Sequence, residues 1–228
     1  MLTVRVTEEW KTTYPGAQIG ILEIAGVDNI LPSEQLEAEK RAVEARLRER
    51  YNGYSRSNFL ALPVMAAYER YYKRFDKTYH VLLQLESIVL KGKNLPEVSP
   101  LVDANFTAEL DTLVLTASHD AACLQPPLLI DVSRVGDMFT RMNGAPKQLS
   151  PGDMVMRDSQ GVICTIIYGQ DNLSPISTST THALYVAYAP PGVGVENVQA
   201  QLDAIEMNIR LFSADCRLVH KLVLSASD

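Results

Sequence analysis

Residues 181–212, THALYVAYAPPGVGVENVQAQLDAIEMNIRLF, join a strand to a helix and indicate how this chain folds. The run 183–189 is a strand candidate, and Pro190-Pro191-Gly192 breaks it. From Val195 to Phe212, apolar residues recur at alternating spacings of three and four, which makes this segment the clearest amphipathic helix in the sequence. A strand followed by a helix with one apolar face predicts a layered domain in which helices cover a sheet.

Other segments extend this pattern along the chain. Apolar residues alternate in 2–6, which predicts a strand, and Ser33 is a suitable N-cap for a helix that begins near Leu31-Pro32-Ser33. This helix continues through 36–51. Further helices are expected from 62, over 79–91 and over 101–116, and further strands over 18–25, 126–133, 153–157, 162–168 and 218–224. Helices come first and strands later, so we expect an α+β layered sheet-and-helix domain rather than a doubly wound parallel sheet.

Length and composition are those of an ordinary globular protein, with 228 residues, 46% hydrophobic and 21% charged. We expect one domain over 1–228, with 1–60 as an N-terminal strand-and-helix extension packed on it. No stretch approaches the roughly 18 apolar residues that span a bilayer. The first ten residues carry charge and contain no apolar signal core, so we expect neither membrane insertion nor secretion.

The net charge of −6 is unevenly distributed. Residues 1–93 contain 14 Lys and Arg against 12 Asp and Glu, whereas residues 94–228 contain 7 against 15. An acidic chain does not coat nucleic acid through its bulk charge, so any such contact requires a local basic patch. The best candidate contains six residues that are positioned for phosphate contact, with a solvated helix surface as the alternative: Arg70, Lys73, Arg74, Lys77, Lys91 and Lys93.

The sequence contains none of several common metal-binding, nucleotide-binding and catalytic motifs. Cys123, Cys164 and Cys216 are widely spaced and form neither a CxxC pair nor a zinc pattern, so we expect reduced thiols and a cytoplasmic protein. The nucleotide fingerprints GxGxxG and GxxxxGK[ST] are missing, as are GxSxG and HExxH. We therefore expect no metal and no cofactor.

Two other sequence features have structural readings. The aromatic stripe that contains Tyr68, Tyr71, Tyr72 and Phe75 follows helical spacing, which favours core packing over a base-stacking platform. The charged run over 37–48 is typical of a solvated helix face.

Polar residues gather in two places that a core does not require. Asp103, Asn105 and Glu109 stand near the start of the predicted helix 101–116, where the first two are also suitable caps. His119 follows that helix, either as a general acid or base or as a surface histidine at an exposed helix end. The second place is the polar loop between two apolar strands, which favours a binding rim or a solvated hairpin: Gly169, Gln170, Thr178 and Thr181.

Three phrases together resemble a known family. They are RFDKTYHVLLQLESIVLKGKNLPEVSPLVDAN at 74–105, THALYVAYAPPG at 181–192, and the helix that follows. They are similar to modules three and four of the phenylalanyl-tRNA synthetase β subunit, a tRNA-binding and editing unit, and most of all to its free-standing relatives. The resemblance covers about residues 60–225, and its most specific part is the phrase LKGKNLP followed by Val-Asp and a nearby Asn.

This resemblance implies a three-layer α+β fold and a pocket between the two modules. In the synthetase, the unit hydrolyses tyrosine that is wrongly attached to the phenylalanine tRNA, so hydrolysis of mischarged aminoacyl-tRNA in trans is the implied activity. Because an aminoacyl ester is already activated, a positioned water suffices and no nucleophilic triad is required. The implied catalytic residues are Asn105, His119 and Thr178, and the implied pocket residues are Asp103, Glu109, Gly169, Gln170 and Thr181.

Two other hypotheses about the function stay open at this point. One is a non-catalytic module of the same fold that binds an amino acid or a nucleoside. The other is a structural or regulatory partner domain that uses the helix 36–51 as its interaction surface. A homo-oligomer is compatible with each of these functional hypotheses.

Overall fold

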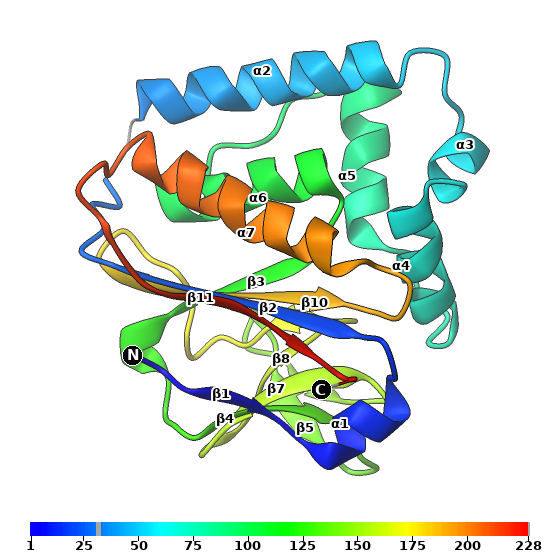
Figure 1. The fold of residues 1–228 in the computed structure, drawn as a ribbon, viewed down its shortest axis with the longest axis vertical. Helices are drawn as coiled ribbons and strands as arrows, with labels where there is room; N and C mark the ends of the chain where they lie inside the picture. Colours follow the sequence, from blue (N-terminus) through cyan, green and yellow to red (C-terminus); the bar gives the residue numbers. More distant parts are fainter. Residues whose placement is uncertain (31–32, 228) are drawn as a thin grey trace.

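The computed structural model describes residues 1–30 and 33–227, and it has three layers (Figure 1). Most helices form the upper layer, a four-stranded sheet the middle one, and a five-stranded sheet the lower one, beside which the short helix Glu8–Thr13 lies. The α-helices are α1 (Glu8–Thr13), α2 (Glu34–Arg50), α3 (Arg56–Leu60), α4 (Pro63–Lys73), α5 (His80–Val89), α6 (Pro100–Thr112) and α7 (Val195–Arg210). The predicted α+β class is confirmed.

The strands divide between the two sheets and one hairpin. The middle sheet has the order β11-β2-β10-β3, and all of its pairs are antiparallel. The lower sheet has the order β1-β4-β7-β8-β9, and β5 and β6 form a separate hairpin. The bounds are β1 (Val4–Val6), β2 (Gln18–Ala25), β3 (Thr116–Asp120), β4 (Leu128–Val132), β5 (Met138–Thr140), β6 (Pro146–Gln148), β7 (Met154–Asp158), β8 (Gly161–Thr165), β9 (Gly169–Gln170), β10 (His182–Ala189) and β11 (Arg217–Ser225).

The N-terminal residues belong to both sheets. Strand β1 pairs in parallel with β4 in the lower sheet, and β2 lies between β11 and β10 in the middle one. Residues 1–60, which the sequence predicts to be an extension packed on the domain, therefore supply an interior strand of its central sheet. Ser33 caps α2 as predicted, since its Oγ accepts a hydrogen bond from the Leu36 N–H at 3.3 Å. Leu31 and Pro32 lie outside the described residues.

Two predicted boundaries differ from the structure near β3. The helix predicted over 101–116 ends at Thr112, and Leu113 adopts a left-handed conformation with φ 64°. The chain then turns into β3, which sequence patterning missed because its five residues, TASHD, include four polar ones. Antiparallel pairing with residues 183–187, rather than apolar alternation, makes this segment a strand, and Ser118 and His119 are buried in it.

Tyrosines of α4 connect the layers. Tyr68 and Tyr79 stack with ring centroids 4.1 Å apart, and the Tyr68 hydroxyl donates to the Tyr188 carbonyl of β10 at 2.7 Å. The Tyr72 hydroxyl donates to the Ile166 carbonyl at 2.8 Å, and the Tyr71 hydroxyl donates to Asp153 at 2.6 Å. The prediction that this stripe packs in the core is confirmed. Because each buried hydroxyl has a partner, the same residues also fix how the helices sit on the sheets.

Helix α7 lies close to the middle sheet at Gly20 of β2. A Cβ atom at Gly20 would stand 2.6 Å from Cγ1 of Val198 and 3.2 Å from the Ala187 Cβ. Because real Cβ contacts are not that short, only glycine allows this approach of helix to strand.

We therefore expect Gly20→Ala to lower the free energy of unfolding by about 1–3 kcal/mol, as overpacking of a core does. Urea unfolding followed by circular dichroism measures the change. The double variant Gly20→Ala/Val198→Ala removes the blocking methyl group, so its loss should be smaller than the sum of the two single losses. Strict additivity would contradict the steric explanation.

The charged helix α2 is not solvated along its whole length, which corrects the sequence prediction. Lys40 and Glu44 are fully buried. The Lys40 ammonium donates to Asp103 of α6 at 2.8 Å and to the Pro96 carbonyl at 3.0 Å, and it pairs with Glu37 of its own helix. Glu44 accepts a hydrogen bond from the Leu95 N–H at 2.7 Å. These bonds attach α2 to α6 and to the loop before it.

Lys40→Met should destabilise the fold, because it leaves the buried Asp103 carboxylate without its cation. Breaking a buried pair on one side costs about 3–5 kcal/mol. The matched control is Lys91→Met, which changes an exposed lysine and should stay within about 0.5 kcal/mol of the original chain. Equal effects of the two substitutions in chemical unfolding at pH 7 would show that the buried pair contributes nothing.

Candidate functional site

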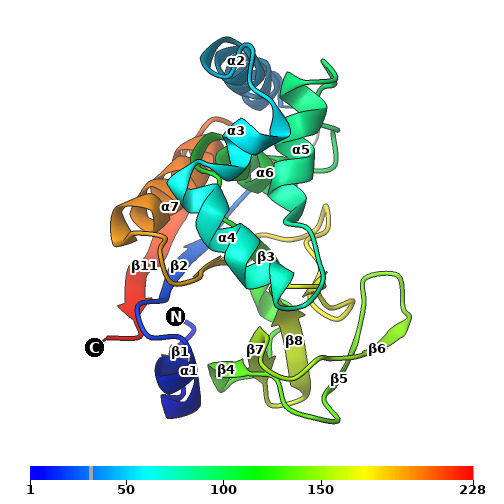
Figure 2. The same cartoon turned by 90° about the vertical axis from the view of Figure 1, so that its right-hand side faces the viewer.

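A cavity of about 590 Å³ lies between α6, the edge strand β3, strand β8 and the β5–β6 hairpin. Figure 2 shows these elements on one side of the molecule, with the hairpin extending from the lower sheet. The lining residues are His80, Val98, Val102, Asn105, Phe106, Glu109, Leu115, Thr116, Ala117, Ser118, Arg141, Met142, Asn143, Cys164, Thr165, Ile166, Tyr168, Gly169, Gln170, Pro175, Ile176 and Tyr188. An apolar wall with a few polar groups is typical of a small-molecule site.

Asn105 and Glu109 form one wall and hold β3 in place. Glu109 accepts a hydrogen bond from the Thr116 N–H at 2.7 Å, and the Asn105 amide donates to the Thr116 carbonyl at 2.9 Å. Both side chains are buried. Burial raises the pKa of Glu109 to about 8, so this carboxyl is protonated at neutral pH and adds no negative charge to the cavity.

Gly169 and Gln170 line the opposite wall. Gly169 has φ 81°, a conformation that turns the chain from β8 into the two-residue strand β9. The Gln170 amide nitrogen donates to the Ser174 carbonyl at 2.7 Å. Its amide oxygen has no hydrogen-bond partner among the described residues, so it is available to accept a hydrogen bond from a ligand or water.

His119 is buried in β3, which corrects the prediction of an exposed helix end. Its ring Nδ1 lies 2.7 Å from the Ser174 Oγ, and burial lowers the pKa of the imidazole to about 3. Asp103 is in the ion pair with Lys40. Thr178 and Thr181 are exposed. None of these four residues is among those that line the cavity, so the structure brings Asn105, Glu109, Gly169 and Gln170 together and leaves the other four outside.

Other lining residues were missed by the sequence analysis. Ser118 on β3 makes no side-chain hydrogen bond to another described residue, and Arg141 and Asn143 come from the turn after β5. His80 lies beside the Tyr72 hydroxyl, and burial lowers the pKa of its imidazole to about 4. None of these residues belongs to a sequence motif. The dipeptide Asn143-Gly144, which is typical of a turn, is the only local pattern that could have indicated this hairpin.

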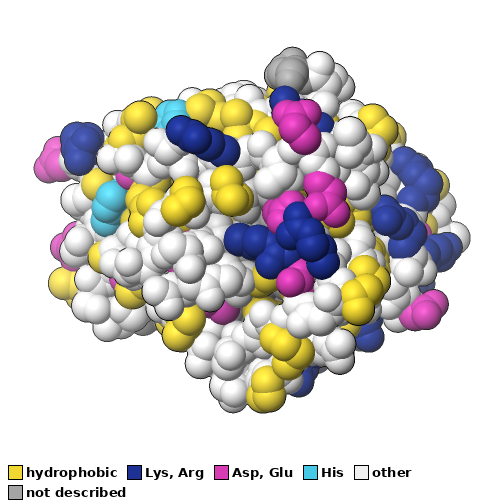
Figure 3. All heavy atoms as spheres, turned by 90° about the horizontal axis from the view of Figure 1, so that it is seen from below, with side chains coloured by type: hydrophobic (Ala, Val, Ile, Leu, Met, Phe, Trp, Pro, Cys, Tyr) yellow, Lys and Arg dark blue, Asp and Glu magenta, His cyan; other side chains and the backbone are white. Residues whose placement is uncertain are grey.

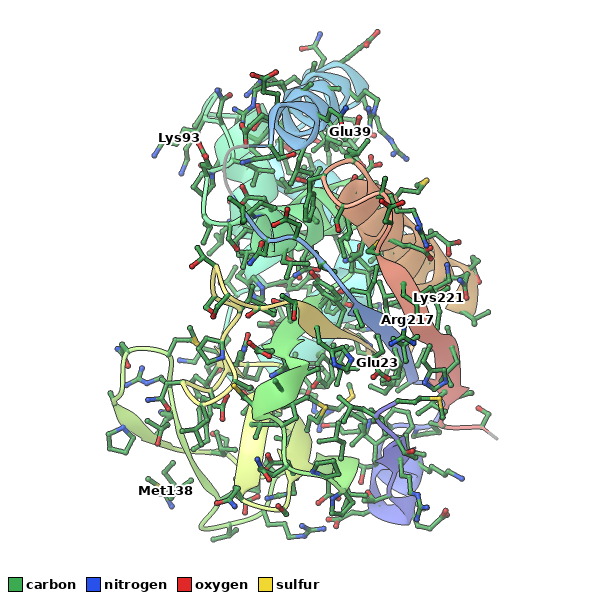
Figure 4. All side chains as sticks on the ribbon, turned by 90° about the vertical axis from the view of Figure 1, so that its left-hand side faces the viewer. Glu23, Glu39, Lys93, Met138, Arg217 and Lys221 are labelled. Atoms are coloured by element: carbon green, nitrogen blue, oxygen red, sulfur yellow. The ribbon has the colours of Figure 1, made fainter. Side chains whose placement is uncertain are left out.

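The six basic residues do not form one continuous patch. The Arg74 guanidinium lies over the rings of Tyr14 and Phe75, and Lys73 pairs with Glu69 at 3.1 Å. The remaining four are exposed: Arg70, Lys77, Lys91 and Lys93. Figure 4 shows Lys93 near one end of α2, beyond α5, whereas Arg70 to Lys77 come before α5. A ten-residue helix of about 15 Å therefore separates the two groups.

The lower face of the molecule has mixed charge. Figure 3 shows Lys and Arg side chains beside Asp and Glu side chains in the middle of this face. Arg157 pairs with Asp131 at 2.9 Å and also with Asp137. Arg134 pairs with the same Asp131 carboxylate at 2.8 Å and with Glu9 at 2.5 Å. Neutralised in this way, these arginines do not form a phosphate-binding surface.

Among residues 1–30 and 33–227, no cluster of three or more His, Cys, Asp or Glu side chains has the geometry to hold a metal ion. In the same residues, no helix is both long enough and apolar enough to cross a membrane.

The family model of the B3/4 domain matches residues 64–212, a segment that makes up more than half of the chain. The chain belongs to the B3/4 domain family. This module occurs in the β subunit of phenylalanyl-tRNA synthetase, and the family resemblance predicted from the sequence is confirmed.

A solved structure has the same fold. It is an N-terminal fragment of the phenylalanyl-tRNA synthetase β subunit from Pyrococcus horikoshii, with 12% identity and a TM-score of 0.50. The similarity covers 92% of this chain and 49% of that fragment, so this B3/4 chain spans about half of the fragment's length. No curated protein matches the sequence.

Four buried titratable groups, two carboxyls and two imidazoles, change the stability of the fold in opposite directions as pH changes. Burial raises the pKa of Glu109 to about 8 and that of Asp153 to about 7, so the native state keeps protons that the unfolded chain has lost. Stability from these carboxyls therefore falls as pH rises from about 4.5 to 8. Burial lowers the pKa of His80 to about 4 and that of His119 to about 3, so the native state keeps both imidazoles neutral. The stability that these histidines contribute to the fold therefore falls as pH drops below about 6.5.

The two effects oppose each other between about pH 4.5 and 6.5, and only the carboxyl effect acts above 6.5. We expect the free energy of unfolding to be greatest in this mildly acidic range and to fall by roughly 2–3 kcal/mol by pH 8. Glu109→Gln cannot titrate and should remove most of that fall, whereas the exposed control Glu97→Gln should keep it. Urea unfolding between pH 5 and 8.5 measures this, and a flat profile for the original chain would contradict it.

Proposed function

We propose that this B3/4 domain binds the aminoacylated 3′ end of a tRNA in the cavity and hydrolyses the ester of a mischarged amino acid. The observation that carries the proposal is the cavity itself, in which one apolar wall faces polar groups from α6, β3 and β9. Its volume of about 590 Å³ is within the range of small-ligand sites. Membership in a family with a module in a tRNA synthetase supports an aminoacyl-tRNA over other esters.

The cavity contains groups for positioning a water molecule at an ester. The free amide oxygen of Gln170 can accept a hydrogen bond from the attacking water and so position it, and the Ser118 hydroxyl can donate to the carbonyl oxygen as negative charge develops there. As the ester bond breaks, the proton of that water passes through solvent to the ribose oxygen that leaves. Asn105 and Glu109 act one step further back, because they fix the strand that carries Ser118. His119 and Thr178, the other catalytic residues that the resemblance implies, lie outside the cavity lining and take no part in this mechanism.

Lys77 is the basic residue best placed to hold the tRNA near this cavity. It is exposed, and it precedes the lining residue His80 by three positions, which limits their separation to about 10 Å along the chain. One or two phosphate contacts of this kind give weak binding, and the slope of log affinity against log salt is then only about −1 to −2.

The test is deacylation of Tyr-tRNA(Phe) and of a panel of other mischarged tRNAs by the purified protein. We expect Gln170→Ala to lower the single-turnover rate about tenfold or more, because the water loses its acceptor. Gln125→Ala makes the same change at an exposed position and should leave the rate unchanged. Deacylation no faster than in buffer, together with no tRNA retention at low salt, would remove the proposal.

One observation favours a second candidate, a non-catalytic module that binds an amino acid or a nucleoside. The basic residues are few and separated, and the chain has a net charge of −6, which gives little attraction for a polyanion. This candidate is expected to show thermal stabilisation by free amino acids or nucleosides and none by tRNA. The partner-binding role of residues 36–51 stays a prediction.

A further inference from the structure

Arg141 is the only Lys or Arg among the described residues that line the cavity. Its side chain is partly buried, and its Nε is enclosed with no hydrogen-bond partner. Three other arginines of the described chain are partly buried, and each pairs with a carboxylate: Arg41 and Arg48 with Glu44, and Arg157 with Asp131. Arg141 has no ion pair with a described residue, although removing a guanidinium from water without a partner is unfavourable.

The backbone around Arg141 is held on both sides. The Arg141 N–H donates to the Ala145 carbonyl at 3.0 Å, and the Gly144 N–H donates back to the Arg141 carbonyl at 2.8 Å. Arg141 also forms an antiparallel bridge with Asp171, in the segment after β9. The backbone that carries this side chain is therefore held in place before any ligand arrives, which reduces the entropy lost on binding.

The remaining charge in the cavity does not balance Arg141. Glu109 is the only Asp or Glu in the lining, and its carboxyl is protonated at neutral pH. The cavity thus combines one uncompensated positive charge with apolar side chains from several elements: Val98, Val102, Phe106, Leu115, Ile166 and Ile176.

We propose that Arg141 binds the anionic group of a ligand whose apolar part occupies the cavity. This inference rests on the proposed function, since it names the chemistry of the ligand at the same site. A guanidinium binds phosphate and carboxylate alike through paired N–H donors. The anion is thus either a phosphodiester near the 3′ end of an RNA or the carboxylate of a free amino-acid derivative, and experiment separates these two sources.

Two ligand pairs test the charge by isothermal titration. N-acetylphenylalanine carries a carboxylate that its neutral amide lacks, and the dinucleotide cytidylyl-(3′,5′)-adenosine carries a phosphodiester charge that its uncharged methylphosphonate analogue lacks. We expect the original chain to prefer the anion about tenfold or more in one pair, which identifies the source. No anion preference in either pair overturns the proposal.

Variants assign that preference to the residue. Arg141→Gln should abolish it, and Arg141→Lys should keep part of it, because a lysine retains the charge but not the paired donors. Arg217→Gln makes the same charge change on β11, which lies on the opposite side of the view from Met138 of β5 in Figure 4, and should keep the preference in full. Thermal unfolding confirms that each variant is folded. An undiminished preference in Arg141→Gln overturns the proposal.

Failure of this inference is distinguishable from failure of the proposed function. Deacylation with an unchanged KM in Arg141→Gln would overturn the role of Arg141 and leave the deacylase intact. An Arg141-dependent preference for the carboxylate ligand without any deacylation would support the role of Arg141 and remove the tRNA activity.

Discussion

Helix α6 is buried on nearly all sides, and the rest of the structure depends on how its polar side chains are paired there. Asp103 meets Lys40 of α2, while Asn105 and Glu109 hold the first residue of β3. On the side of α7, the Asn208 amide donates to the Ala104 carbonyl at 3.0 Å. A buried polar group without a partner lowers stability by about 1–3 kcal/mol. Any shift of α6 that broke these hydrogen bonds would carry that cost, so the pairings fix the position of the helix among its neighbours. Asn105 and Glu109, which make two of these pairings, also line the cavity together with Val102 and Phe106.

Much of the fold could be predicted from the sequence where one side of an element is apolar and the other polar. The spacing of apolar residues over 195–212 located α7, and the helical spacing of the tyrosines in 68–72 correctly indicated a core face. The same reasoning failed for α2, because Lys40 and Glu44 look like surface residues until their partners at Asp103 and Leu95 are known. Those partners are more than 50 residues away, and local pattern contains no information about them.

The candidate site was predictable only in part, for a related reason. Asn105, Glu109 and Gln170 stood out as polar residues at element ends, and they do line one cavity. His119 was expected at an exposed helix end, as a general acid or base or as a surface histidine, because its strand could not be recognised. Arg141 was not selected at all, because a lone arginine in a turn resembles any surface arginine. What distinguishes it is the lack of a carboxylate partner, and that property exists only in three dimensions.

The interior position of β2 has a consequence for synthesis of the chain. Both of its neighbours come from far downstream: β10 begins at His182 and β11 at Arg217. At about 5–20 residues per second, a ribosome needs roughly 8–30 s after completing β2 before it has made the first residue of β10. Throughout that interval the apolar strand has two bare edges, each able to pair with another nascent chain. Residues 18–25 are thus a segment that must be kept from intermolecular pairing during translation, until β10 and β11 cover both of its edges.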